Sequence, residues 1–243
     1  MKAEDRPAFY ALATGGWRDY VTLLHLPYTG WHLSYVAIGA AAAPRFEGGR
    51  LGATILAFFL AVGLSAHALD ELSGRPLRTR ISRRVLVVIA AAGLIGAAAI
   101  GVAGAVEVSW WLLAFVAFGA FVVPAYNLEL LGGRVHDDLW FSVAWGAFPA
   151  VVGYVAQDGR LGWAVVPIAL ACLLLSSAQR RLSTPVRELR RRVVSVEGRM
   201  TLQDGTDRAL DADVLRAAPE TALRALAFGI MALAAGLVIA RLA

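Results

Sequence analysis

The chain has little lysine and little cysteine. Lys2 is the only lysine among 243 residues, although there are 22 arginines. A retinal protein needs a lysine inside a membrane helix for its Schiff base, so that class of seven-helix protein is excluded. Cys172 is the only cysteine, which excludes an intrachain disulfide and a cysteine metal cluster. Residues 1–19 lack an apolar stretch and a cleavage site, so we expect no signal peptide there.

Apolar residues, in contrast, are abundant. They make up 58% of the chain, and the mean hydropathy is +0.63, whereas soluble domains are about 45–50% apolar. We therefore predict one all-α domain over residues 1–243, folded as a polytopic membrane helical bundle. A spanning helix needs roughly 20 mainly apolar residues. The segments that meet this need are about 20–43, 51–70, 85–106, 109–129, 139–156, 161–178 and 221–241.

The distribution of positive charge predicts how these seven segments are oriented. If the N-terminus is cytoplasmic, 19 of the 23 lysines and arginines fall on the cytoplasmic side. Only Arg45, Arg50, Arg160 and Arg241 then lie outside. Because positive residues concentrate on the cytoplasmic side of membrane proteins, we predict about seven transmembrane helices with a cytoplasmic N-terminus. The expected location is the cytoplasmic membrane of a bacterium or archaeon.

The long connection at about 179–220 is predicted to be a basic cytoplasmic segment with structure of its own. Thr184 and Pro185 suit the N-cap and first position of an amphipathic helix. Residues 193–202 and the Gln-Asp-Gly turn after them predict a small hairpin. Pro219 is interpreted as the beginning of the last helix.

Residues 67–84 concentrate ionisable side chains at the end of the second apolar segment. His67, Asp70 and Glu71 have i, i+3, i+4 spacing and would share one face of a helix. Such a face suits hydrated Mg²⁺, which takes oxygen ligands and keeps substrate phosphate in its shell. We therefore predict that Asp70 and Glu71 hold Mg²⁺. Ionisable groups at a membrane boundary are costly unless they bind something, but these residues also fit a stop-transfer junction of solvated charges.

Arginine has a planar guanidinium group that matches phosphate oxygens, so nearby arginines are candidates for holding a diphosphate. The predicted diphosphate ligands are Arg75, Arg78, Arg80, Arg134, Arg180 and Arg181. Further candidates on the same side of the membrane are Tyr126, Asn127, Asp137 and Asp138. The two adjacent aspartates either complete a metal site or are charges at a helix N-terminus. His25 and His32 lie seven residues apart, on one face of the predicted helix. They are either a metal or haem pair or core residues.

The order of these parts resembles the UbiA superfamily of intramembrane prenyltransferases. Residues 75–84, Arg-Pro-Leu-Arg-Thr-Arg-Ile-Ser-Arg-Arg, are similar to the stretch that follows the family's first aspartate-rich motif. Residues 67–71 occupy the place of that motif. A second similarity lies in residues 126–154, where a tyrosine and Arg134 precede a helix with the pattern Gly-x-x-Pro-x-x-x-Gly.

The resemblance implies a funnel of helices that opens toward the cytoplasm and binds Mg²⁺ and an isoprenyl diphosphate. His67, Asp70 and Glu71 would be catalytic, and the prenyl group would pass to a lipid-soluble acceptor. Residues 176–184, where the family has its second acidic motif, contain no carboxylate. The alternative is a non-catalytic membrane module that binds anionic lipid or a protein partner through basic loops. We expect no nucleic-acid partner, because the chain is dominated by apolar spans.

Overall fold

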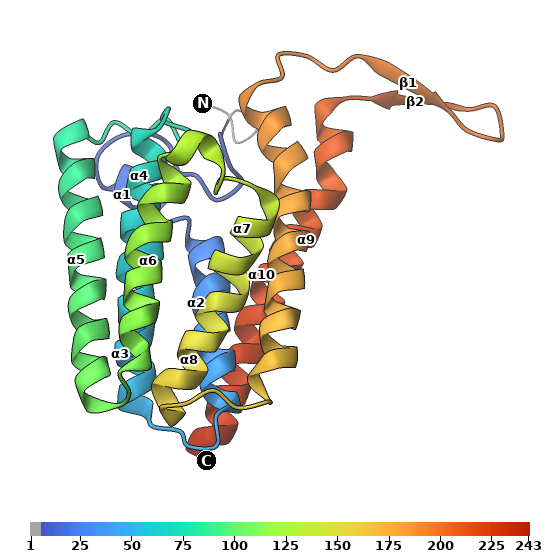
Figure 1. Ribbon diagram of the computed structural model, residues 1–243. Coiled ribbons are helices and arrows are strands. Elements are labelled where there is room, and N and C mark those ends of the chain that lie inside the picture. The colour runs from blue at the N-terminus through green and yellow to red at the C-terminus, as the bar shows by residue number, and fades with distance from the viewer. Residues whose placement is uncertain (1–5) are drawn as a thin grey trace.

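The computed structural model describes residues 6–243 as a bundle of helices with one hairpin that projects from it (Figure 1). The first part of the bundle contains α1 (Trp17–Leu23), α2 (Leu26–Ala42), α3 (Gly48–Phe58), the π-helix η2 (Phe59–Ala66), α4 (His67–Leu72), α5 (Arg83–Glu107) and α6 (Trp111–Asn127). The second part contains the 3₁₀ turn η3 (Leu131–Gly133), α7 (Asp138–Ser142), the π-helix η4 (Val143–Ala147), α8 (Phe148–Asp158), α9 (Val165–Arg191), β1 (Gly198–Thr201), β2 (Asp207–Leu210) and α10 (Ala212–Leu242). The predicted all-α bundle and the predicted hairpin are both confirmed.

Five helical stretches are long and apolar enough to cross a membrane, which indicates a membrane protein. They are Gly48–Leu72, Arg83–Glu107, Asp138–Asp158, Val165–Arg191 and Ala212–Leu242. Four of them cover a predicted span in full, and Val165–Arg191 covers the span predicted at about 161–178 from residue 165 on. The helices α2 and α6 have 17 residues each and are shorter than these five. It therefore stays a prediction that α2 and α6 cross the membrane and that there are seven spans in total. The cytoplasmic N-terminus also stays a prediction.

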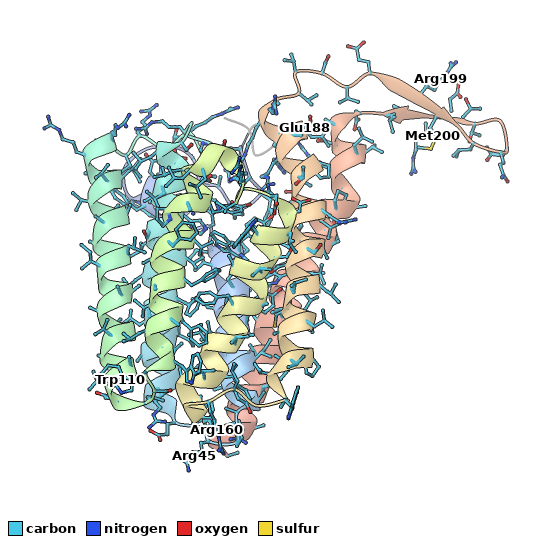
Figure 2. All side chains as sticks on the ribbon, in the orientation of Figure 1. Arg45, Trp110, Arg160, Glu188, Arg199 and Met200 are labelled. Atoms are coloured by element: carbon cyan, nitrogen blue, oxygen red, sulfur yellow. The ribbon has the colours of Figure 1, made fainter. Side chains whose placement is uncertain are left out.

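The two ends of the bundle differ in charge. Figure 1 shows that α5 begins, α9 ends and α10 begins at the end where the N-terminal segment also lies. We call this the arginine-rich end, because residues 75–84 and 180–192 belong to it. The opposite end carries Arg45, Trp110 and Arg160 and the C-terminus (Figures 1 and 2). A ligand that enters from the arginine-rich end therefore meets positive charge first.

Helix α2 lies at the centre of the bundle and packs closely on α8. Added methyl groups at Gly39 and Gly153 would collide with the backbone carbonyls of Ala150 and Val36, respectively. The two backbones therefore touch directly, as is common between membrane helices that carry small residues at their contact. Trp31 of α2 is fully buried, in a cluster with Val186 of α9 and Leu223 of α10.

The first predicted helix, at about 20–43, is wrong as a continuous helix. His25 has a left-handed backbone (φ 45°) and separates α1 from α2. Pro27, in the first turn of α2, cannot donate a backbone hydrogen bond to the preceding turn. The carbonyl of Leu24 is satisfied instead by the hydroxyl of Thr29, at 2.6 Å. His25 and His32 consequently do not share a helix face.

Two predicted helix beginnings are also wrong. Helix α9 continues through Thr184 and Pro185 to Arg191, so Thr184 is not an N-cap. The Thr184 hydroxyl instead donates to the carbonyl of Arg180 at 2.8 Å. Helix α10 begins at Ala212, where the Asp211 carboxylate accepts a hydrogen bond from the Val214 amide at 2.8 Å, so Pro219 lies inside the helix. In both helices, continuous packing and capping outweigh the one hydrogen bond that a proline removes.

Candidate functional site

Glu71 fastens the loop between α4 and α5. Its side chain is buried, and its carboxylate accepts hydrogen bonds from the Leu77 amide (3.0 Å), the Thr79 amide (2.8 Å) and the Thr79 hydroxyl (2.8 Å). Both carboxylate oxygens are therefore engaged by the loop itself. A buried carboxylate with three donors is stable without any ligand.

Arg75 also holds this loop. Its guanidinium Nη1 donates to the carbonyls of Thr79 (2.8 Å) and Ile81 (2.9 Å). The amide of Arg80 donates to the buried carboxylate of Asp19 at 2.8 Å, which ties the loop to α1. The stretch most similar to the family motif is thus a loop that is fastened mainly by its own hydrogen bonds.

Three histidines meet beneath this loop. The rings of His25 and His67 stack with their centroids 3.9 Å apart. The Nδ1 atoms of His67 and His32 lie 3.2 and 2.8 Å from the carbonyls of Gly63 and Trp145, respectively. These carbonyls can only accept, so Nδ1 carries a hydrogen in both rings, and in the neutral form of each ring the lone pair lies on Nε2. Gly63 and Trp145 lie in η2 and η4, and π-helices of this kind frequently occur at functional sites.

Arginines of α9 face Asp70 across the bundle. The charges of Arg187 and Arg191 are close enough to the Asp70 carboxylate to interact with it electrostatically. Arg187 also interacts with the phenol of Tyr126, whose oxygen is buried without a hydrogen-bond partner among residues 6–243. Arg180 lies on the same side and pairs with Asp138, with 3.0 Å between nitrogen and oxygen.

These side chains form one group, which we call the polar cluster. It consists of Tyr10, His25, Tyr28, His32, His67, Asp70, Tyr126, His136, Arg180, Arg187 and Arg191. Its three arginines face two carboxylates, Asp70 and the Asp138 that pairs with Arg180, so the cluster keeps an excess of positive charge and suits an anionic group. Arginine side chains that are half-buried bind such a group more strongly than fully solvated ones.

The N-terminal segment closes the polar cluster toward the arginine-rich end. The Tyr10 hydroxyl lies 3.0 Å from Nδ1 of His25, and burial raises the pKa of this phenol above its ordinary value, so it stays protonated. Arg191 donates to the carbonyl of Pro7 at 3.2 Å. Arg190 donates to the carbonyl of Arg6 (3.2 Å) and to both carboxylate oxygens of Glu220 (2.8 and 2.9 Å).

On the other side of the polar cluster lies an apolar cavity of about 350 Å³, which we call the apolar slot. It is bounded by α3, α5, α6 and the stretch η4–α8, and it is lined largely by alanine, glycine and valine. It extends from Arg50 and Glu107 at the opposite end of the bundle to Val123 and Trp145 near its middle. The Trp145 ring packs on Tyr126 of the polar cluster with 4.5 Å between centroids. Slot and cluster are thus separated by one layer of aromatic side chains.

The structure brings some of the predicted site residues together and separates others. His67, Asp70, Tyr126 and Arg180 belong to the polar cluster, and Asp138 pairs with Arg180. Glu71 and Arg75 hold the loop, the Asn127 amide donates to the Val123 carbonyl, and Asp137 caps α7 through the Trp140 amide. Arg78, Arg80, Arg134 and Arg181 are exposed. For Asp137, the interpretation as a helix N-terminal charge is confirmed.

The residues present do not fit a Mg²⁺ site in which Asp70 and Glu71 are both ligands. Both Glu71 oxygens already accept hydrogen bonds from the loop. Within residues 6–243, no group of three or more histidine, cysteine or acidic side chains is placed to hold a metal ion. Magnesium binding therefore stays a prediction, and the chemistry below rests on the arginines.

Sequence reasoning missed Arg191 as a member of the site. Arg180, Arg187 and Arg191 are spaced i, i+7, i+11, which places them on one helix face. This signal appears only if the helix runs through Pro185, whereas the proline was interpreted as a helix beginning. Tyr10 was missed because its segment has no helical or strand pattern.

No protein-family model, no curated protein and no solved structure matches this chain. The resemblance to the UbiA superfamily rests on residues 67–84 and 126–154. In the structure, His67, Asp70 and Tyr126 from these stretches belong to the polar cluster.

Proposed function

We propose that this protein binds a lipid with a phosphate-bearing headgroup, namely an isoprenyl diphosphate. The headgroup would lie in the polar cluster, and the isoprenyl chain would lie in the apolar slot. The observation that carries the proposal is that only the aromatic layer of Tyr126 and Trp145 separates an arginine-rich cluster from an apolar cavity. In this proposal the protein transfers the prenyl group to a hydrophobic acceptor, as in the UbiA-like enzymes that it resembles.

The proposed headgroup site depends on α9. Arg180, Arg187 and Arg191 project from one face of this helix, and all three are only partly exposed. Their guanidinium groups can each donate two parallel hydrogen bonds to phosphate oxygens. The unpaired hydroxyl of Tyr126 supplies a further donor at the boundary with the slot. These donors suit a diphosphate better than a carboxylate, which offers fewer acceptor oxygens.

The proposed chain site has the composition of a lipid pocket. The lining part of α5 runs from Leu94 to Glu107, so the slot is about 20 Å long at the helical rise of about 1.5 Å per residue. Its volume of about 350 Å³ falls within the range of roughly 300–1,000 Å³ found for ligand pockets. Apolar walls and this length match a branched hydrocarbon chain.

The proposed chemistry is heterolysis followed by alkylation. The allylic C–O bond breaks, and its electron pair leaves with the diphosphate, whose growing charge is stabilised by Arg180, Arg187 and Arg191. The allylic cation lies against the rings of Tyr126 and Trp145, whose faces attract cations. A C–C bond then forms to the acceptor. The proton that the acceptor loses is taken up by Nε2 of His67 or by Asp70.

A second candidate function is lipid binding without turnover. It is favoured by the absence of a three-ligand metal group within residues 6–243, because prenyl transfer of the usual kind uses metal-bound diphosphate. In that case the polar cluster would hold an anionic headgroup, and nothing would be released. Both candidates place the arginine-rich end in the cytoplasm, where positive charge concentrates.

Titration of the detergent-purified protein with a non-hydrolysable farnesyl diphosphate analogue tests the proposal. It is made with and without Mg²⁺, on the wild type, Arg187→Gln and Asp70→Asn. The control is Arg181→Gln, which removes an exposed arginine from the same helix. We expect Arg187→Gln to weaken binding about tenfold, because one charge-assisted contact is lost, and Arg181→Gln to bind like the wild type. Equal affinities for all variants would overturn the headgroup site.

Turnover separates the two candidates. Wild-type protein in lipid vesicles is incubated with farnesyl diphosphate and a series of hydrophobic aromatic acceptors, and released inorganic diphosphate is measured. Release that requires an acceptor supports transfer. Binding without release supports the lipid-binding function and excludes catalysis with these acceptors.

A further inference from the structure

We infer that the β1–β2 hairpin is a membrane-surface arm, one face of which lies on anionic phospholipid headgroups. The hairpin leaves the bundle between α9 and α10 and extends sideways, crosswise to the helices (Figure 1). A segment in this orientation runs parallel to the plane of a membrane that the helices cross. The inference concerns a surface outside the polar cluster and does not depend on the proposed function.

The strand register gives the hairpin two chemically different faces. Met200 is opposite Arg208, and Thr201 is opposite Asp207. Residues opposite each other in an antiparallel pair point to the same face, and successive residues alternate between faces. One face therefore carries Met200 with Arg208, whereas the other carries Thr201 with Asp207.

The second face is satisfied by its own polar contacts. Asp207 pairs with Arg199 at 3.2 Å and accepts a hydrogen bond from the Thr201 hydroxyl at 2.8 Å. The first face has no such network within the paired strands, whereas in the turn beyond them the Thr206 hydroxyl donates to the Asp204 carboxylate at 2.7 Å. Its side chains continue in register to Leu202 and Leu210, so it combines apolar groups with the cation of Arg208 and no carboxylate within the paired strands. A face of this composition is typical of segments that lie in a membrane interface.

The apolar face of the hairpin points toward the membrane-crossing part of the bundle. Figure 2 shows the side chain of Met200 on the side of the hairpin toward the membrane-crossing part of the bundle, and Arg199 on the opposite side. Met200 and Leu202 are 38% and 42% exposed, respectively, although both are apolar. Lipid is the neighbour that this geometry offers them.

The expected level of the membrane surface agrees with this position. The hairpin extends near the level at which α5 begins (Figure 1). There Arg83 and Arg84 are followed directly by the exposed apolar side chains of Val85, Val87 and Val88. Arginines followed by lipid-facing valines mark the boundary between headgroups and hydrocarbon. Arg208 would lie near the same boundary, where anionic lipid headgroups attract cationic side chains.

Fluorescence of single labels on the two faces tests the inference in the full chain. Met200→Cys and Thr201→Cys are made in a Cys172→Ala background and labelled with an environment-sensitive fluorophore. Leu202→Cys provides a second position on the apolar face. Each protein is placed in nanodiscs of phosphatidylcholine, with and without phosphatidylglycerol, that contain a headgroup-proximal spin-labelled lipid as a quencher.

We expect labels at 200 and 202 to be quenched about threefold more than the label at 201, because an interfacial segment buries its apolar face about 5–10 Å deep. Phosphatidylglycerol should strengthen this quenching, and Arg208→Gln should remove the strengthening. Equal quenching on both faces would overturn the inference. Shielding of position 200 that rises with protein concentration in detergent would assign the face to a second copy, which also overturns it. Quenching that does not change when phosphatidylglycerol is added would overturn the claim that the face lies on anionic headgroups.

Discussion

Asp70 and Glu71 are adjacent in the chain, but their carboxylates serve different parts of the molecule. Glu71 is turned into the loop and accepts three hydrogen bonds from Leu77 and Thr79. Asp70 faces the arginines of α9. The i, i+3, i+4 spacing that grouped both with His67 describes a helix face correctly, but it cannot reveal which carboxylate the following loop will engage.

This difference predicts opposite phenotypes for two conservative substitutions. Glu71→Gln should lower the free energy of unfolding by about 3 kcal/mol, because amide hydrogens replace an acceptor that faces buried donors. Asp70→Asn should leave the thermal unfolding of the detergent-solubilised protein nearly unchanged and alter the binding of the diphosphate analogue. Thermal unfolding and titration of both variants make the comparison. A stable Glu71→Gln variant that has lost binding would instead support a ligand role for Glu71.

The ion pair between Arg190 and Glu220 joins α9 to α10 and also holds the N-terminal segment in place. Their side chains are only 6% and 9% exposed, and Arg190 also donates to the carbonyl of Arg6. Glu220→Gln should cost about 3–5 kcal/mol of stability, because it removes the carboxylate from a buried ion pair. The exposed Glu188 of α9 supplies the control, as Glu188→Gln. Amide exchange of residues 6–11 should become faster only in Glu220→Gln, and unchanged exchange would contradict the tie to the segment.

At the scale of elements, the sequence predicted what depends on local periodicity. The five long apolar helices and the hairpin were predicted because their patterns are unbroken over many residues. The sequence did not predict the interruption at His25 or the continuity of α9 through Pro185. Packing against neighbouring helices decides whether a helix ends at a proline. That error concealed the stripe formed by Arg180, Arg187 and Arg191, and with it most of the positive side of the site.

The apolar slot supplies a prediction at the same scale. Ala98 lines the slot, whereas its neighbour Ala99 is exposed on the outer side of α5. Ala98→Phe should fill part of the cavity and weaken binding of the farnesyl analogue about tenfold, a loss of about 1.4 kcal/mol. Ala99→Phe adds the same ring on the exposed side of the helix and should bind normally. Inorganic diphosphate should bind both variants equally, since it has no chain. Equal weakening by both variants would contradict a chain site in the slot.

On the scale of the whole molecule, the bundle has a polar half and an apolar half along one axis. The arginine-rich end holds the polar cluster, the fastened loop of residues 73–82 and the N-terminal segment. The slot occupies the other half and reaches the opposite end at Arg50 and Glu107. Charge counting on the sequence predicted the first half, because arginine is plentiful on one side of the spans. A cavity between α3, α5 and α6 is set by tertiary packing of small residues, and no local pattern predicts it.

Photo-crosslinking tests this two-part arrangement most directly. A farnesyl diphosphate analogue with a diazirine at the end of its chain is bound to the wild-type protein, irradiated, and mapped by mass spectrometry. We predict adducts on slot residues such as Ala98, Phe115 and Val116, and their loss when excess unlabelled diphosphate analogue competes. Adducts on the exposed faces of α5 and α10, for example at Ile95 and Phe228, that persist under competition would contradict the account.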